Sequence, residues 1–109
     1  MRIWDIAVDR LCRNHLLGEH RELHAVWTIL TRKKRGYSRH PETLRWKGKL
    51  KALFARHQEL VEEIRKRGYM HSSPLDSRLA VGKATQDFLV TSKRRQIKRL
   101  REKRCGCKV

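Results

Sequence analysis

The sequence predicts an all-α fold, a compact single domain of about three helices. Two segments repeat apolar residues every three or four positions, as amphipathic helices do, and no segment alternates apolar and polar residues as a half-buried strand does. The chain has 109 residues, of which 39% are hydrophobic. That length is typical of one domain and that composition of one modest core. No internal repeat or Pro/Gly/Ser-rich linker divides the sequence, so we expect 1–109 to form a single domain.

The first periodic segment predicts a helix from about Asp9 to Thr31, with Asp9 as a suitable N-cap residue. A basic loop is predicted after it, over residues 32–39, because four consecutive cations are followed by Gly36 and a polar stretch. The apolar residues on one side of the helix are Cys12, Leu16, Leu23, Val26, Trp27 and Leu30.

A second helix is predicted to begin at Pro41, whose missing amide is harmless in a first helical turn. The clearest helix in the sequence follows, from about Lys47 to Arg67. Gly68 stands where a helix C-cap belongs, directly after three basic residues. The apolar face of this helix comprises Leu50, Leu53, Phe54, His57, Leu60, Val61 and Ile64.

The last third of the chain carries a weaker signal. Residues 69–76 are predicted to be irregular, and a final helix is expected over 85–103. Beyond Val90, only Ile97 and Leu100 are spaced to face a core.

The charge balance points to a polyanionic partner. The chain has 28 Lys and Arg against 11 Asp and Glu, a net charge of +17. Positive charges in such excess repel one another unless a polyanion binds to them. Each contact between a cation and a nucleic-acid phosphate releases counterions, and this release favours binding. An anionic membrane surface is the alternative partner. The basic C-terminal segment 93–109 is either a solvated helical face or frayed tail, or an arm that contacts DNA.

Sequence signals for a membrane, a secretory route or a metal are weak. No run approaches the roughly 20 apolar residues that a membrane span requires, and charge interrupts the N-terminus at once. We therefore expect a cytoplasmic protein without membrane contact. Its three cysteines are then free thiols. Zinc bound by Cys105, Cys107 and nearby histidines is conceivable, but no second spaced pair supports it, and we expect neither metal nor cofactor.

Two acids and a histidine border the apolar side of the first helix. With His15 as the reference, Glu19 and Glu22 lie within about 40° of it on a helical wheel. Acids beside a core call for an explanation in so basic a protein. One explanation is structural, an ion pair along the helix or with a neighbouring helix, and the other is a functional site.

The run LCRNHLLGEHREL (Leu11–Leu23), close behind Met1-Arg2-Ile3, resembles the phage endonuclease V type of pyrimidine-dimer DNA glycosylase. A looser similarity covers Leu50–Tyr69, where an amphipathic helix ends in Lys-Arg-Gly-aromatic. That family has an all-helical fold and uses the chain's own α-amino group as its nucleophile.

The resemblance implies roles for individual residues. Met1 corresponds to the family's first mature residue, and Arg2 behind it is bulky enough for Met1 to be retained, so its amine is the expected nucleophile. Glu22 matches the catalytic glutamate. The active-site histidine falls on His15, and DNA-contacting arginines fall on Arg2 and Arg21.

Further DNA contacts are expected from the composition alone. The basic loop contributes Arg32, Lys33, Lys34 and Arg35 as phosphate contacts. Trp46, flanked by cations, is the expected base-stacking residue.

Together these features predict a DNA repair glycosylase with abasic-site lyase activity. Its substrate would be double-stranded DNA with cyclobutane pyrimidine dimers or a related lesion, and the protein would act as a monomer. The alternative is a non-catalytic basic DNA-binding protein of the same fold. The two hypotheses differ in whether the N-terminal amine forms an imine with DNA.

Overall fold

The fold consists of helices, and the all-α prediction is confirmed. A computed structural model describes residues 2–33, 36, 38–71 and 73–109. Within these ranges there is no strand, only an isolated bridge between Lys49 and Gly82, and no helix is long and apolar enough to cross a membrane. The elements in order are the 3-10 turn η1 (Val8–Arg10), α1 (Arg13–Arg32), α2 (Pro41–Trp46), α3 (Leu50–Lys66), the 3-10 turn η2 (Ser77–Leu79) and α4 (Lys93–Glu102).

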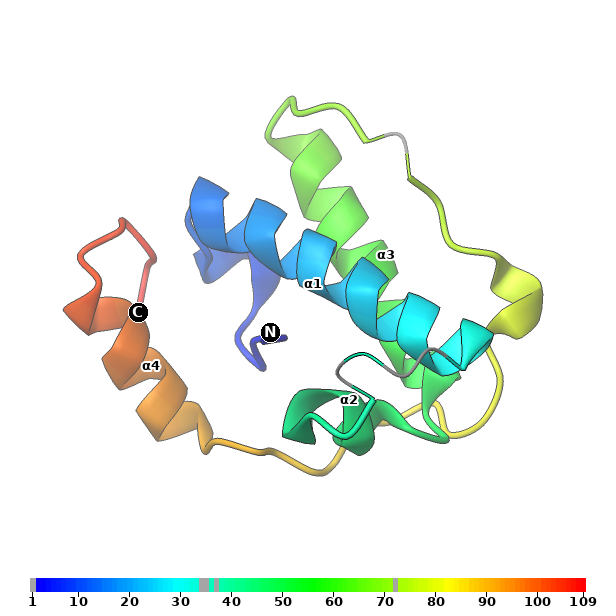
Figure 1. Cartoon of the computed structure of the whole chain (residues 1–109). Helices are drawn as coiled ribbons and strands as arrows, with labels where there is room; N and C mark the ends of the chain where they lie inside the picture. Colours follow the sequence, from blue (N-terminus) through cyan, green and yellow to red (C-terminus); the bar gives the residue numbers. More distant parts are fainter. Residues whose placement is uncertain (1, 34–35, 37, 72) are drawn as a thin grey trace.

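The core lies where α1 crosses α3, and the N-terminal segment runs beside this crossing (Figure 1). The predicted apolar faces of both helices are buried there, with Leu30, Leu50 and Phe54 at the edge. Each fully buried Leu or Ile contributes roughly 1.5–3 kcal/mol from the burial of its apolar surface. The completely enclosed side chains on α1 and α3 include Leu16, Leu23, Val26, Leu53 and Leu60.

The first helix begins later than predicted. Asp9 belongs to η1, and α1 starts at Arg13 after Cys12, an extended N-cap residue whose side chain makes no capping hydrogen bond. Leu11 is buried, so the chain turns inward here before the helix starts. The expected N-cap at Asp9 is therefore wrong, because burial of Leu11 interrupts the helical path.

The middle helices follow the prediction closely. Pro41 opens α2, and the His40 side chain caps it by accepting a hydrogen bond from the Glu42 amide. The amides of Lys51 and Ala52 in the first turn of α3 donate to the carbonyls of Val81 and Lys83, so a distant segment satisfies this helix end.

Gly68 ends α3 as predicted. Its amide donates to the Arg65 carbonyl and the Tyr69 amide to the Ile64 carbonyl, which is the pattern of a Schellman motif.

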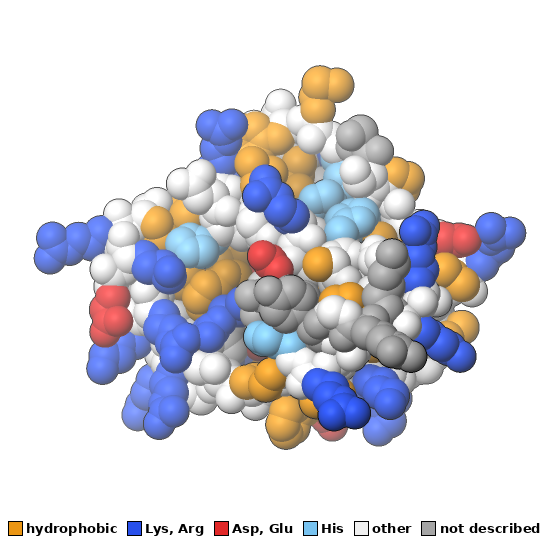
Figure 2. Space-filling model, viewed as in Figure 1, with side chains coloured by type: hydrophobic (Ala, Val, Ile, Leu, Met, Phe, Trp, Pro, Cys, Tyr) orange, Lys and Arg blue, Asp and Glu red, His pale blue; other side chains and the backbone are white. Residues whose placement is uncertain are grey.

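The last helix is shorter than predicted and docked by its own contacts. It spans Lys93–Glu102, capped by the Ser92 hydroxyl, while residues 80–92 approach it as a mainly irregular segment. Leu100 is only 1% exposed, and the Gln96 amide group accepts from the Asp5 amide and donates to its carboxylate. The segment is thus not a frayed tail. Its exposed face remains strongly basic, and Lys and Arg side chains ring the face shown in Figure 2.

Candidate active site

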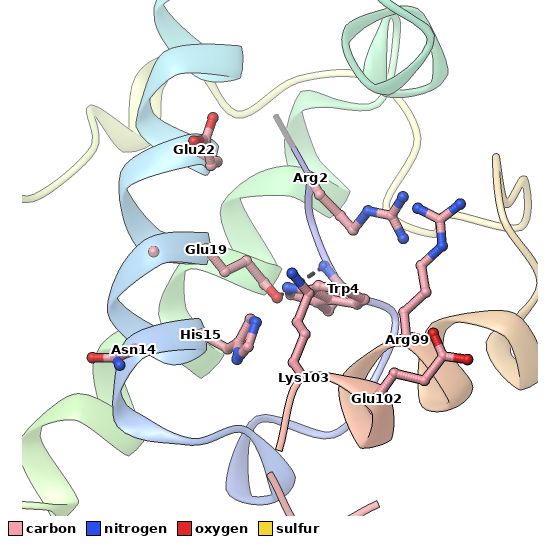
Figure 3. Close-up of a pocket in the computed structure, with 10 residues that line it drawn as sticks. Arg2, Trp4, Asn14, His15, Glu19, Glu22, Arg99, Glu102 and Lys103 are labelled. Atoms are coloured by element: carbon pink, nitrogen blue, oxygen red, sulfur yellow. Dashed lines mark hydrogen bonds between the residues drawn. The ribbon is translucent and has the colours of Figure 1, made fainter. Parts of the chain in front are cut away.

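A cavity of about 560 Å³ opens between α1, the N-terminal segment and α4 (Figure 3). Its volume falls in the range of small-ligand sites. It is lined by Arg2 and Trp4 from the N-terminal segment, by Asn14, His15, Gly18, Glu19 and Glu22 from α1, and by Arg99, Glu102 and Lys103 at the end of α4.

Backbone hydrogen bonds hold the N-terminal segment at this cavity. The Trp4 amide donates to Glu19 at 2.9 Å, and the Asp5 amide donates to Gln96 at 2.8 Å. Arg45 of α2 donates to the Ile3 carbonyl at 3.0 Å from the other side. Residues 3–5 are therefore bound to three different helices, and this anchoring fixes the direction in which the chain reaches Arg2.

Glu19 forms a buried ion pair with Arg56 of α3. The Arg56 Nε and Nη2 atoms donate to the two Glu19 oxygens at 2.7 and 3.1 Å, and Glu19 is only 2% exposed. Burial raises the pKa of the Glu19 carboxyl, while Arg56 and the Trp4 amide act against that shift. One of the two acids beside the core thus has the structural role, an ion pair with a neighbouring helix.

We expect Arg56→Ala to destabilise the fold by about 3–5 kcal/mol, because it leaves the Glu19 carboxylate buried without its partner. The free energy of unfolding from denaturant titration measures this effect. Glu59→Gln is the matched control, since Glu59 also contacts Arg56 but its side chain is 58% exposed. Its loss is expected to cost under about 1 kcal/mol. Equal losses in both variants would contradict the structural role of the buried pair.

Glu22 differs from Glu19 in its surroundings. It lies one helical turn further along α1, is half-buried and lines the cavity. It forms no ion pair with any residue that the structure describes. Its carboxylate is therefore available to a molecule in the cavity.

Cations gather on the opposite wall of the cavity. The guanidinium groups of Arg2 and Arg99 lie side by side in Figure 3, and Lys103 points into the same space. Burial, followed by repulsion from Arg99, lowers the pKa of Arg2. Arg2 also lies over the Trp4 ring, 4.9 Å from its centroid, and its Nη1 atom is buried without a hydrogen-bond partner among the described residues. An anion bound here would satisfy that donor and relieve the repulsion.

His15 borders the same cavity. Its ring packs edge-on against Trp4 with the centroids 5.6 Å apart, while its Nδ1 atom faces the Cys12 sulfur at 3.1 Å. Burial and, secondarily, Lys103 lower the pKa of His15. The ring is therefore biased toward its neutral form.

The structure thus brings together three residues predicted for the site, Arg2, His15 and Glu22. Arg21, Arg32 and Lys33 are exposed and do not line the cavity, although their surface positions suit phosphate contacts. The remaining predicted residues Met1, Lys34 and Arg35 lie outside the described residues.

The stacking role predicted for Trp46 is contradicted by its burial. Its side chain is 3% exposed, and its Nε1 donates to Glu42 at 3.1 Å. Because α2 turns this ring into the core, bases cannot stack on it in this structure.

Comparison with known families identifies the family of this chain. Residues 1–77 match the model of a family described as pyrimidine dimer DNA glycosylase. The chain belongs to this family. The match covers α1, α2 and α3 and therefore Arg2, His15 and Glu22, whereas α4 lies beyond it. No curated protein and no solved structure matches the chain.

The sequence reasoning missed the contribution of α4 to this site. Arg99, Glu102 and Lys103 come from the segment beyond the family match, and they form one wall of the cavity. The burial of Leu100 places these residues there. The apolar spacing of Ile97 and Leu100 was the only signal in the sequence for a docked helix.

Proposed function

We propose that this pyrimidine dimer DNA glycosylase family member also cleaves the strand as an abasic-site lyase, with the α-amine of Met1 as nucleophile. The observation that carries the proposal is the shared cavity of Glu22 and Arg2, the residue that follows Met1. The cavity thus holds a carboxylate without an ion-pair partner among the described residues, together with the side chain of the second residue of the chain.

The α-amine of a first residue suits this role because its ammonium form has a lower pKa than that of lysine. An α-amine has a reference pKa of about 7.7–8.0, so about a tenth to a fifth of it is neutral at pH 7. A lysine amine, with a pKa of about 10.4, is almost wholly protonated. Arg2 and Arg99 line the cavity, and cations close to an amine disfavour its protonated form.

The proposed reaction has two parts. The neutral amine attacks C1′ of the damaged nucleotide as the bond from C1′ to the base breaks, and the base leaves with that electron pair and takes up one of the two amine protons. The bond from C1′ to O4′ then opens, O4′ takes up the second proton, and an imine forms between the amine nitrogen and C1′. Removal of a C2′ proton then lets the 3′ phosphate leave, which nicks the strand. Glu22 would stabilise the positive charge that develops at C1′ and assist proton transfer.

The rest of the cavity would bind the substrate. Arg2, Arg99 and Lys103 offer donors to the phosphates on both sides of the lesion. A damaged or abasic nucleotide costs less to turn out of the duplex than a paired one, which favours such sites over intact DNA.

Borohydride trapping tests the proposal. Reduction converts an imine into a stable amine, so the native protein is expected to become covalently attached to duplex DNA that contains an abasic site. A shift in gel mobility reports the adduct, and the same duplex without the abasic site is the control. Absence of an adduct under conditions where binding is saturated would leave the alternative, a non-catalytic DNA-binding member of the family.

A further inference from the structure

Two groups of metal-ligating side chains converge among the described residues, and neither takes part in the proposed reaction as a group. One contains Cys12, His15, Cys105 and Cys107, and the other contains His20, His24, His57 and His71. In each group, all four donor atoms lie within 4.8 Å of one another.

We propose that Cys12, His15, Cys105 and Cys107 bind a structural zinc ion. The Nδ1 atom of His15 lies 3.1 Å from the Cys12 sulfur and 3.5 Å from the Cys107 sulfur. The Cys105 and Cys107 sulfurs are also 3.5 Å apart. Around a tetrahedral zinc ion, two sulfurs are about 3.8 Å apart and a sulfur and a nitrogen about 3.5 Å. These three distances lie within about 0.4 Å of the tetrahedral values, and all four donor atoms lie within 4.8 Å of one another.

The donor set selects zinc over a disulfide or a hard cation. Three sulfurs and one imidazole form one of the closed sets that structural zinc sites use, and soft thiolates disfavour Mg²⁺ and Ca²⁺. A disulfide requires sulfurs about 2.05 Å apart and would use two of the three cysteines only. The Cys12 amide also donates to the Cys107 sulfur at 3.1 Å, a contact that stabilises a metal-bound thiolate.

The local backbone and charge favour this site. Gly106 has a φ of +96°, a left-handed conformation that suits glycine and turns the two flanking cysteines toward α1. Zinc with three thiolates carries one net negative charge. The hollow next to Cys12 and Cys105 is lined by more cations than acids, and Arg10, Arg13 and Lys108 are among the cations.

Zinc here would join the C-terminal segment to the start of α1. The tail already pairs with η1, because the Lys108 amide donates to the Arg10 carbonyl at 2.7 Å and the Arg10 Nε donates back to the Lys108 carbonyl. Cys105 lies two residues after Lys103, which lines the cavity, and His15 itself lines the cavity. The ion would therefore hold Arg99 and Lys103 opposite Glu22.

The second group stands on a separate observation, and we infer that it binds a second zinc ion. The Nε2 atom of His24 lies 3.2 Å from the Nε2 atoms of both His20 and His57, and that of His71 lies 3.0 Å from His20. Four imidazole nitrogens around a tetrahedral zinc ion are about 3.3 Å apart. Histidine side chains of α1, α3 and the segment after α3 thus meet at one point.

Hydrogen bonds among the four histidines cannot satisfy all of their converging ring nitrogens. A ring nitrogen carries either a proton or a lone pair, yet the Nε2 atoms of His20 and His24 each contact two other Nε2 atoms. One ion accepts all four lone pairs at once. The Nδ1 atom of His57 lies 3.0 Å from the Gln58 side-chain oxygen, which orients this ring.

Metal analysis of the full chain, purified without a histidine tag, tests both sites. Mass spectrometry of the metal content is expected to find two zinc ions per chain. The double variant Cys105→Ser/Cys107→Ser and the double variant His20→Asn/His71→Asn are each expected to retain one. His40→Asn is the matched control, because His40 belongs to neither group and asparagine preserves an N-cap.

Cobalt substitution separates the sites in the wild-type chain, so the result does not depend on variants that fail to fold. Cobalt bound to thiolates gives a charge-transfer band in the near ultraviolet, which imidazoles do not give. We expect this band and binding of two cobalt ions per chain. Absence of the band overturns the cysteine site, and saturation at one ion with the band present overturns the histidine site. Neither readout depends on catalysis.

Discussion

Acetylation of the Met1 amine is expected to abolish borohydride trapping on abasic DNA while leaving DNA binding nearly intact. The acetyl group removes the nitrogen lone pair that forms the imine. It removes at most one positive charge from a chain with a net charge of +17, so the attraction to phosphate changes little. Gel mobility measures the adduct and fluorescence anisotropy measures binding, with intact mass spectrometry to establish that Met1 is acetylated.

A chain lengthened by one glycine before Met1 is the matched control for this experiment. It retains an α-amine of similar pKa but moves that amine away from the position set by residues 3–5, which backbone hydrogen bonds hold to α1, α2 and α4. We expect weakened trapping with normal binding. Trapping that persists at full strength in the acetylated protein would assign the nucleophile to a lysine and contradict the role of Met1.

Much of the scaffold follows from local patterns in the sequence. The apolar spacing in α1 and α3 predicted which faces are buried, because a helix in a small domain has one core to face. Pro41 and Gly68 mark helix ends through their own backbone preferences. The errors at Asp9 and over residues 85–92 arose where tertiary contacts, such as burial of Leu11, outweigh helix propensity.

The site could be predicted only in part. Its N-terminal and α1 residues lie in a short motif whose resemblance to a known family was visible in the sequence. The wall that α4 contributes depends on a long-range contact, between Gln96 and Asp5, that no local pattern reveals. The converging Cys and His groups were visible only in part, because Cys105 and Cys107 suggested a zinc site but the sequence did not show which distant residues join them. Their members are up to 95 positions apart in the chain, as Cys12 and Cys107 show.

Trp46 shows how composition misleads at a single residue. Its basic neighbours suggested a surface that binds nucleic acid, but Lys47 is exposed while Arg45 and Trp46 are buried. Arg45 is satisfied by Asp5, Glu42 and two backbone carbonyls. A cation in the sequence is therefore not always a surface charge, and here it helps to anchor the N-terminal segment of the site.

Glu22→Gln is expected to lower the rate of base excision by about 10²-fold or more, the loss typical of a general acid–base group. Glutamine preserves the size of the side chain but removes the charge that would stabilise the developing cation at C1′. Because Glu22 forms no ion pair with any described residue, the substitution is expected to change the free energy of unfolding by less than about 0.5 kcal/mol. Single-turnover excision on dimer-containing duplex DNA measures the rate.

The matched control is Glu102→Gln, the same change on the opposite wall of the same cavity. Glu102 lies on the exposed face of α4, beyond the part of the chain that matches the family. Its loss removes the same charge from the cavity, so a purely electrostatic effect on DNA affinity would appear equally in both variants. We expect Glu102→Gln to excise at nearly the wild-type rate. Similar rates in the two variants would show that Glu22 acts only through the net charge of the cavity, and the assignment of Glu22 as the catalytic carboxylate would then be wrong.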